Sequence, residues 1–179
     1  VALYNPSDTV CSFSVPFSSL EFGGNVKVRD LVKHNDLGSF SGTFEQTLPA
    51  HSAMFLRMEG ETRLEPTLYE AEWGYMPLYD DLERKNKQIT FQSNKAATGG
   101  VKGINIGGKA QNSIEWKDVY SSTGGNYKMT IYYSCKDSRN LEVSVNGKKQ
   151  IVKNLVSGDK DAIATRTIEV NLKKGNNEI

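Results

Sequence analysis

Apolar and polar residues alternate along most of this chain, and this pattern constrains the fold more than any other feature. Val26 and Val28 alternate with Lys27 and Arg29, whereas no stretch keeps apolar residues at the spacing of a helix for long. Neighbouring side chains of a strand point to opposite faces, so the alternation indicates antiparallel sheets with one face exposed to solvent. We therefore expect an all-β protein.

The first of two β-patterned segments comprises residues 1–62 and predicts a small antiparallel β-sandwich domain. Turn-forming residues, among them Gly23-Gly24-Asn25, separate its short strands. Arg29 and Asp30 are adjacent in one strand and point to opposite faces, which favours a structural role over a shared functional site. A sheet of about 60 residues buries only about 60% of its unfolded surface. We therefore expect this segment to pack against something upstream.

The second segment comprises residues 63–179 and predicts a jelly-roll β-sandwich, because it combines many short strands with glycine-rich turns. Asn146-Gly147 lies between alternating runs, and a type I′ hairpin turn requires positive φ at both central residues. The pair therefore predicts a hairpin. Three runs are expected to supply the strand faces: Tyr127, Met129, Ile131 and Tyr133; Leu141, Val143 and Val145; and Ile168, Val170 and Leu172.

Charge and composition exclude several classes of partner. With 22 Lys+Arg against 21 Asp+Glu, the net charge of +1 gives no electrostatic reason to expect nucleic acid or an anionic membrane. No apolar run approaches the ~20 residues that cross a bilayer. Cys11 and Cys135 lie in different segments, so neither core requires a disulfide. His34 and His51 have no partner at a recognisable catalytic spacing, which favours turn or docking roles.

Four strings of the first segment occur in an order that points to one enzyme family. They are Val1-Ala2-Leu3-Tyr4-Asn5, Val28-Arg29-Asp30-Leu31, Asp36-Leu37-Gly38, and His51 followed by Met54-Phe55-Leu56-Arg57. Together they resemble the C-terminal β-domain of family 27 glycoside hydrolases, the α-galactosidases. The resemblance implies an upstream (β/α)8 barrel that carries both catalytic aspartates, so we expect this chain by itself to be inactive. Val32 and Ser52 depart from a Trp and a Gly that are common in the family.

Five strings follow one another through the second segment. They are Tyr69-Glu70-Ala71-Glu72, Gly103-Ile104-Asn105-Ile106-Gly107-Gly108, Gly125-Asn126-Tyr127-Lys128-Met129, Leu141-Glu142-Val143-Ser144-Val145-Asn146-Gly147, and Leu172-Lys173-Lys174-Gly175-Asn176-Asn177-Glu178-Ile179. In this order they resemble carbohydrate-binding modules of families 35 and 6. Such a module holds a sugar polymer near a catalytic domain and raises the local substrate concentration.

Glu70 and Glu72 match the acidic pair that contributes to a structural calcium site in these module families. Residues two apart on a strand face the same way, so we expect both carboxylates to converge on one cation. Backbone carbonyls would complete about six to eight oxygen ligands at ~2.3–2.6 Å. The families usually add an Asp beyond the strand with which this sequence closes. The alternative is a solvated acidic strand edge.

Sugar rings present apolar C–H faces, so a sugar site needs exposed aromatic rings together with polar side chains that bond hydroxyl groups. Trp116 shares its parity with Ile114 and is expected in the core, whereas the side chain of Trp73 fits either face. The polar loop 136–140 has suitable hydrogen-bonding chemistry, and the loop 157–161 lacks the Trp that many family members carry there. The candidate aromatics are Trp73, Tyr75, Tyr79, Trp116 and Tyr120, and the selected sugar-binding residues are Trp73, Tyr79, Asp137, Arg139, Asn140 and Lys160.

The two resemblances together predict a non-catalytic C-terminal region of an α-galactosidase-like enzyme. The first segment would brace the barrel, and the second would bind a galactoside-containing or plant polysaccharide. Val1 lies inside an apolar alternation without an initiator Met, and Ile179 closes a run where a strand is starting, so we expect a piece of a longer protein that is secreted or periplasmic. The alternative function is a structural or oligomerisation sandwich without glycan affinity.

Overall fold

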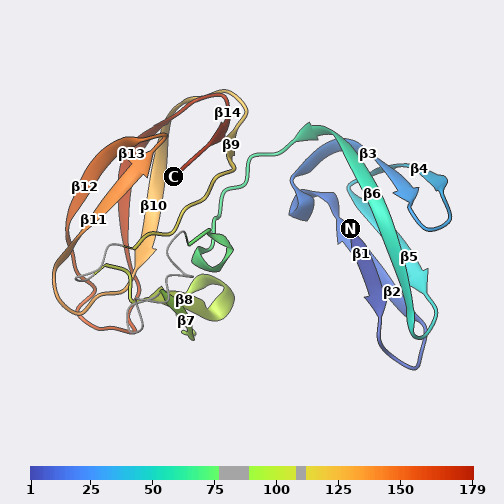
Figure 1. The fold of residues 1–179 in the computed structure, drawn as a ribbon, viewed down its shortest axis with the longest axis horizontal. Coiled ribbons are helices and arrows are strands. Elements are labelled where there is room, and N and C mark those ends of the chain that lie inside the picture. The colour runs from blue at the N-terminus through green and yellow to red at the C-terminus, as the bar shows by residue number, and fades with distance from the viewer. Residues whose placement is uncertain (77–88, 108–111) are drawn as a thin grey trace. The chain divides into compact units, whose positions relative to one another are not determined.

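The computed structural model describes residues 1–76, 89–107 and 112–179 (Figure 1). The chain divides into two compact units, an N-terminal unit of Val1–Glu65 and a C-terminal unit of Pro66–Ile179. Every pair of strands in the described ranges is antiparallel, which confirms the predicted all-β class. No helix in these ranges is long and apolar enough to cross a membrane.

The N-terminal unit consists of a four-stranded sheet in the order β1-β6-β3-β4 and a second sheet in which β2 pairs with β5 (Figure 1). One turn of 3₁₀-helix, η1, lies between β2 and β3. The bounds are β1 (Ala2–Asn5), β2 (Cys11–Pro16), η1 (Phe17–Leu20), β3 (Phe22–Asp30), β4 (Asn35–Ser41), β5 (Thr43–Leu48) and β6 (Ser52–Arg63).

The core of the N-terminal unit draws side chains from both sheets and from η1. The alternation at Val26 and Val28 correctly predicts a buried face, because both side chains are almost inaccessible to solvent. Phe40 and Phe44 meet edge to face, with ring centroids 5.1 Å apart. The buried core residues are Leu3, Phe17, Val26, Val28, Phe44, Leu48, Met54 and Leu56.

The glycine pair at Gly23-Gly24 forms a bulge within β3, so the prediction of a turn at this position is wrong. The register between β3 and β6 shifts between Gly23 and Val26, and Gly24 adopts a φ of +72°. The carboxylate of Glu61 on β6 accepts the Asn25 N–H at 2.9 Å. The backbone donor that the bulge removes from the ladder therefore keeps a partner, and the strand continues.

Asp30 has the structural role that the sequence favours. Its side chain is 2% exposed, and its carboxylate accepts the backbone N–H groups of Lys33 and Val32 at 2.9 Å each. These bonds hold the pKa of Asp30 below its usual value. The resulting stability is present above the unfolded pKa of ~3.9 and is lost as the pH falls through the lower folded pKa. Arg29 faces the other way and donates to Asp36 at 2.7 Å.

Both histidines lie in turns, as predicted, with positive φ angles of 55° at His34 and 52° at His51. The side chain of His51 has a partner that its spacing did not reveal, because its Nε2 lies 2.8 Å from Oδ1 of Asp8. Both of these side chains are exposed. Cys11 and Cys135 are free cysteines.

The described strands of the C-terminal unit form four antiparallel pairs, β7–β8, β9–β14, β10–β13 and β11–β12 (Figure 1). Two short 3₁₀ turns, η2 and η4, precede the long strands. The bounds are η2 (Ala71–Trp73), β7 (Thr90–Ser93), η4 (Thr98–Gly100), β8 (Val101–Ile104), β9 (Val119–Ser121), β10 (Gly125–Tyr133), β11 (Arg139–Val145), β12 (Lys148–Leu155), β13 (Ala164–Leu172) and β14 (Gly175–Asn177).

The hairpin and the strand faces predicted for this unit are confirmed. Val145 pairs with Lys148, and Asn146 and Gly147 between them have φ angles of 50° and 83°, as a type I′ turn requires. The alternating residues of all three predicted runs pack in one core. Its buried members are Val119, Val143, Val145, Val152, Leu155, Val170 and Leu172, and Tyr127, Met129, Ile131, Tyr133, Leu141 and Ile168 pack against them.

We expect Phe17→Ala to destabilise the N-terminal unit strongly, because it removes a ring that is 2% exposed. Loss of a buried Phe typically costs about 3–5 kcal/mol, a large fraction of the stability of a domain this small. Phe55→Ala is the matched control, since that ring is 50% exposed. Denaturant unfolding of both variants measures the difference, and equal losses would contradict this assignment of the core.

Candidate functional site

The acidic pair Glu70 and Glu72 lies on a 3₁₀ turn and its approach, so the prediction of a strand at this position is wrong. Glu70 itself is extended, but the chain then turns, because Trp73 donates its N–H to the Glu70 carbonyl at 3.2 Å. The indole Nε1–H of Trp116 donates to the same carbonyl at 3.0 Å. The first hydrogen bond closes the turn, and the second ties the turn to Trp116.

The two carboxylates nevertheless converge on one place, the backbone at Gly99 in η4. A Cβ atom added there would lie 3.4 Å from Oε1 of Glu72 and 3.7 Å from Oε1 of Glu70. Oε2 of Glu72 is buried without a hydrogen-bond partner. Burial, together with the nearby charge of Glu72, raises the pKa of Glu70. The described part of the chain thus holds two close carboxylates whose negative charge is poorly compensated.

This arrangement fits a hard cation in part. Two carboxylates that approach the same glycine are suitable oxygen ligands for Ca²⁺, which takes the rest of its shell from carbonyls and water. Within residues 1–76, 89–107 and 112–179, no group of three or more His, Cys, Asp or Glu side chains could hold a metal ion. Glu70 and Glu72, with their two close carboxylates, are the side chains that could hold such a cation.

Trp73 and Tyr75 present aromatic rings on the outside of the same segment. Their exposed fractions are 72% and 54%. Gly74 between them is extended and faces inward, since a Cβ there would lie 2.2 Å from Cγ2 of Ile114. Because Gly74 faces inward, the side chains on either side of it lie on the outer surface of the segment. Trp116 packs partly buried against the core, as predicted, and Tyr79 lies outside the described residues.

Of the remaining sugar-binding candidates, Asp137 and Lys160 lie in polar loops. Arg139 and Asn140 are the first residues of β11, so the prediction of a loop through residue 140 is wrong. Cys135 donates its N–H to Ser157 Oγ at 2.9 Å, and Ser157 donates its N–H to the Cys135 carbonyl at 2.9 Å. These bonds bring together the loop with Asp137, which leads into β11, and the loop with Lys160. All four candidate side chains belong to exposed residues, but none forms a described hydrogen bond with Trp73.

Two residues that the sequence did not single out hold the second loop in place. Lys102 on β8 has a side chain only 9% exposed, and its ammonium contacts Oδ1 of Asp161 at 2.8 Å and the Lys160 carbonyl at 2.5 Å. The amide of Asn94, a buried residue, donates to the Asp161 carbonyl at 3.0 Å. The hydrogen bond and charge of Lys102 lower the pKa of Asp161. No local pattern could identify Lys102, because its partners lie nearly 60 residues away.

A comparison with protein families finds a match to the N-terminal part of the chain. Residues 1–58 match the alpha galactosidase C-terminal beta sandwich domain. This match confirms the resemblance that the four strings of the first segment predicted. A comparison with curated proteins finds no match to the chain.

Several solved structures are similar to this one. A family 35 carbohydrate-binding module from Clostridium thermocellum is 26% identical, with a TM-score of 0.52, and the match covers 62% of this chain and 81% of the module. An isomalto-dextranase from Arthrobacter globiformis, complexed with panose, is 18% identical with a TM-score of 0.53, over 99% of this chain. An exo-β-1,3-galactanase from Phanerochaete chrysosporium, with galactose, is 20% identical with a TM-score of 0.51, over 93% of this chain.

The present chain spans only 30% of the isomalto-dextranase and 38% of the galactanase. At these identities the two enzymes share the fold alone with it. The family match and the likeness to the family 35 module support an accessory region of a glycoside hydrolase, built from a β-sandwich domain and a second unit folded like a carbohydrate-binding module.

We expect Gly74→Ala to destabilise the C-terminal unit by about 1–3 kcal/mol, the usual cost of overpacking a filled site. The added methyl group would overlap Ile114, whereas at the control position, Gly103→Ala, its nearest neighbour is an Ile114 atom at 3.6 Å. Thermal unfolding and Trp fluorescence of both variants measure the effect. An equal and small change in both would contradict the close packing described for Gly74.

Proposed function

We propose that this chain is a non-catalytic, carbohydrate-binding accessory region of a glycoside hydrolase. The observation that carries the proposal is the pair of exposed rings, Trp73 and Tyr75, on a unit that resembles a family 35 carbohydrate-binding module. Exposed aromatic rings stack on the apolar faces of sugars, and their exposure otherwise costs hydrophobic free energy. A secreted or periplasmic location, where polysaccharides are met, is part of the proposal.

Calcium is the second part of the proposal. A cation between Glu70 and Glu72 would give the buried Oε2 of Glu72 a partner and offset the repulsion between the two carboxylates. It would also tie η2 to η4, because both carboxylates face Gly99. Its contribution is thus to fix the segment that displays Trp73 and Tyr75 rather than to take part in a reaction.

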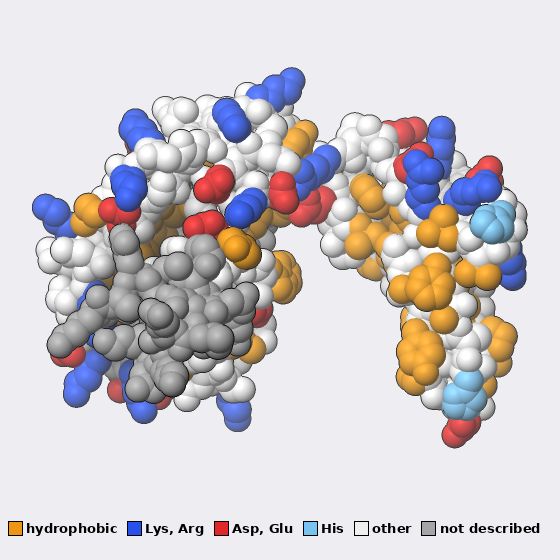
Figure 2. Space-filling view, viewed as in Figure 1, with side chains coloured by type: hydrophobic (Ala, Val, Ile, Leu, Met, Phe, Trp, Pro, Cys, Tyr) orange, Lys and Arg blue, Asp and Glu red, His pale blue; other side chains and the backbone are white. Residues whose placement is uncertain are grey.

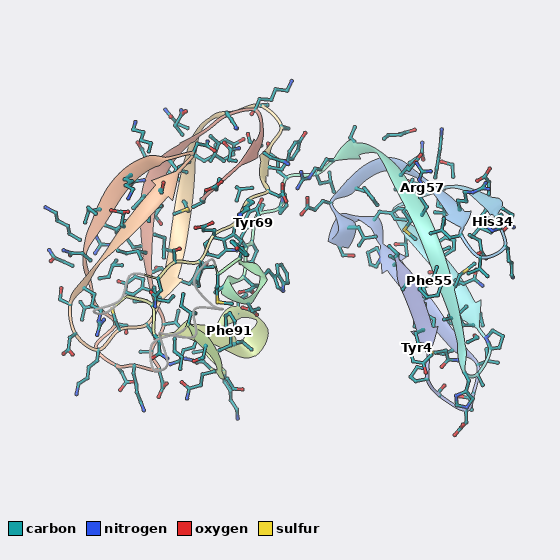
Figure 3. The ribbon with its side chains drawn as sticks, in the orientation of Figure 1. Tyr4, His34, Phe55, Arg57, Tyr69 and Phe91 are labelled. Carbon is teal, nitrogen blue, oxygen red and sulfur yellow. The ribbon has the colours of Figure 1, made fainter. Side chains whose placement is uncertain are left out.

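The third part of the proposal is that the N-terminal unit packs against a linked catalytic domain. Tyr4 on β1 and Phe55 on β6 are 61% and 50% exposed, and the pairing of Ala2 with Phe55 and of Tyr4 with Ala53 places both rings on one sheet face (Figure 3). Hydrophobic side chains gather on the surface of this unit in Figure 2. An apolar sheet face of this kind suits contact with a linked catalytic domain.

Calcium binding is tested by the thermal unfolding of the chain with calcium and with a chelator. A ligand at 100 times its Kd adds about 2.7 kcal/mol to the free energy of unfolding, so calcium is expected to raise the Tm of the C-terminal unit. Glu72→Gln should abolish most of this rise. Glu169→Gln, which changes an exposed residue of β13, should preserve it. If calcium leaves the Tm of the unaltered chain unchanged, the cation site is refuted.

Glycan binding is tested on an array of galactosides, galactomannan, xylan and uronic-acid sugars, probed with and without calcium. Calcium-sensitive binding to at least one glycan is expected. The alternative function, a structural or oligomerisation sandwich, predicts no binding under either condition. In that case the exposed rings would lie at an interface between proteins, and analytical ultracentrifugation would measure the oligomeric state.

A further inference from the structure

We propose that Trp73, Tyr75 and Lys117 form a binding site for an uncharged pyranose ring, here named the Trp73 platform. The inference rests on the proposed function and adds to it the place of the site and the class of sugar. Trp73 and Tyr75 flank the inward-facing Gly74 with exposed rings, and the Lys117 ammonium lies 4.2 Å from the centroid of the Tyr75 ring. All three residues are exposed.

The backbone of the platform is fixed on both sides before any ligand arrives. Tyr75 and Glu115 exchange both of their backbone hydrogen bonds, at 2.7 and 2.8 Å. Trp116 exchanges its own with Ile179, at 2.9 and 3.0 Å. Because the neighbouring segments are paired in this way, little backbone order must be gained on binding, which favours affinity.

Each side chain of the platform has a distinct task. The wide ring of Trp73 offers a free face for the C–H groups of a sugar. Lys117 lies over the ring of Tyr75 in a cation–π contact, which orients Tyr75 and leaves ammonium protons for sugar hydroxyl groups. Stacking and hydrogen bonding are therefore available side by side.

The charges around Lys117 argue for an uncharged sugar. Glu115 lies two residues before it in the sequence and Asp118 directly follows it, so this stretch carries two carboxylates and one ammonium group. An anionic sugar would gain little from Lys117 while approaching these carboxylates. A ring whose substituents are hydroxyl groups meets no such repulsion.

The two polar loops are the competing place for a sugar, and they offer less. The Lys160 carbonyl already accepts from Lys102 and Ser134, and Oδ1 of Asn140 accepts the Asn154 N–H. The exposed ring of Tyr132 is the aromatic side chain at the β10 end that leads into these loops. It provides a matched control for the platform.

The test is isothermal titration calorimetry with four probes: β-1,3-galactotriose, mannotriose, xylotriose and trigalacturonic acid. We expect at least one neutral trisaccharide to bind. Trp73→Ala should weaken this binding by about tenfold or more, Lys117→Gln by a smaller factor, and Tyr132→Ala by less than twofold. Because the changed side chains are exposed, all three variants should keep the Tm of the unaltered chain.

The outcomes separate the platform from the proposed function. If a neutral trisaccharide binds equally well after Trp73→Ala but not after Tyr132→Ala, glycan binding stands and the platform is refuted. A preference for trigalacturonic acid refutes the argument for an uncharged ring. If none of the four probes binds and the glycan array is also negative, the proposed function and the platform fail together.

Discussion

The carbonyl oxygen of Glu70 is the point on which the architecture of the site depends. It accepts the N–H of Trp73 and the indole Nε1–H of Trp116, so one acceptor both closes the η2 turn and ties it to the segment around Trp116. The turn directs the carboxylates of Glu70 and Glu72 toward Gly99 and leaves Trp73 outside. A short segment therefore has an acidic inner face and an aromatic outer face.

This division explains how a small β-sandwich can combine stability with exposed aromatic rings. Aromatic rings that bind a ligand must stay in water until it arrives, so other interactions must hold their backbone. Here the close packing of Gly74 against Ile114 and the backbone pairing of Tyr75 with Glu115 supply them. A cation at the two carboxylates would add a further tie between η2 and η4, with no role in chemistry.

The sequence predicted those features that repeat or that need a special backbone conformation. Alternation identified the buried faces at Val26 and Val28, and the Asn146-Gly147 pair identified a hairpin because few residues tolerate positive φ. It failed where a distant partner decides the local structure. Gly23-Gly24 forms a bulge because Glu61 on another strand satisfies the freed donor. The chain turns after Glu70, where the carbonyl of Glu70 accepts from Trp73 and from the distant Trp116. Lys102 could not be found for the same reason, since only the fold brings it to Asp161.

The most direct test of the two-faced segment uses the two tryptophans of the chain as reporters in one NMR titration. The indole N–H of Trp116 lies on the inner side, bonded to the Glu70 carbonyl, whereas the Trp73 ring is exposed on the outer side. We expect calcium to shift the Trp116 indole signal, and a subsequently added neutral oligosaccharide to shift that of Trp73. Sugar-induced shifts confined to residues 136–140 and 157–161, with the Trp73 signal unmoved, would contradict the account.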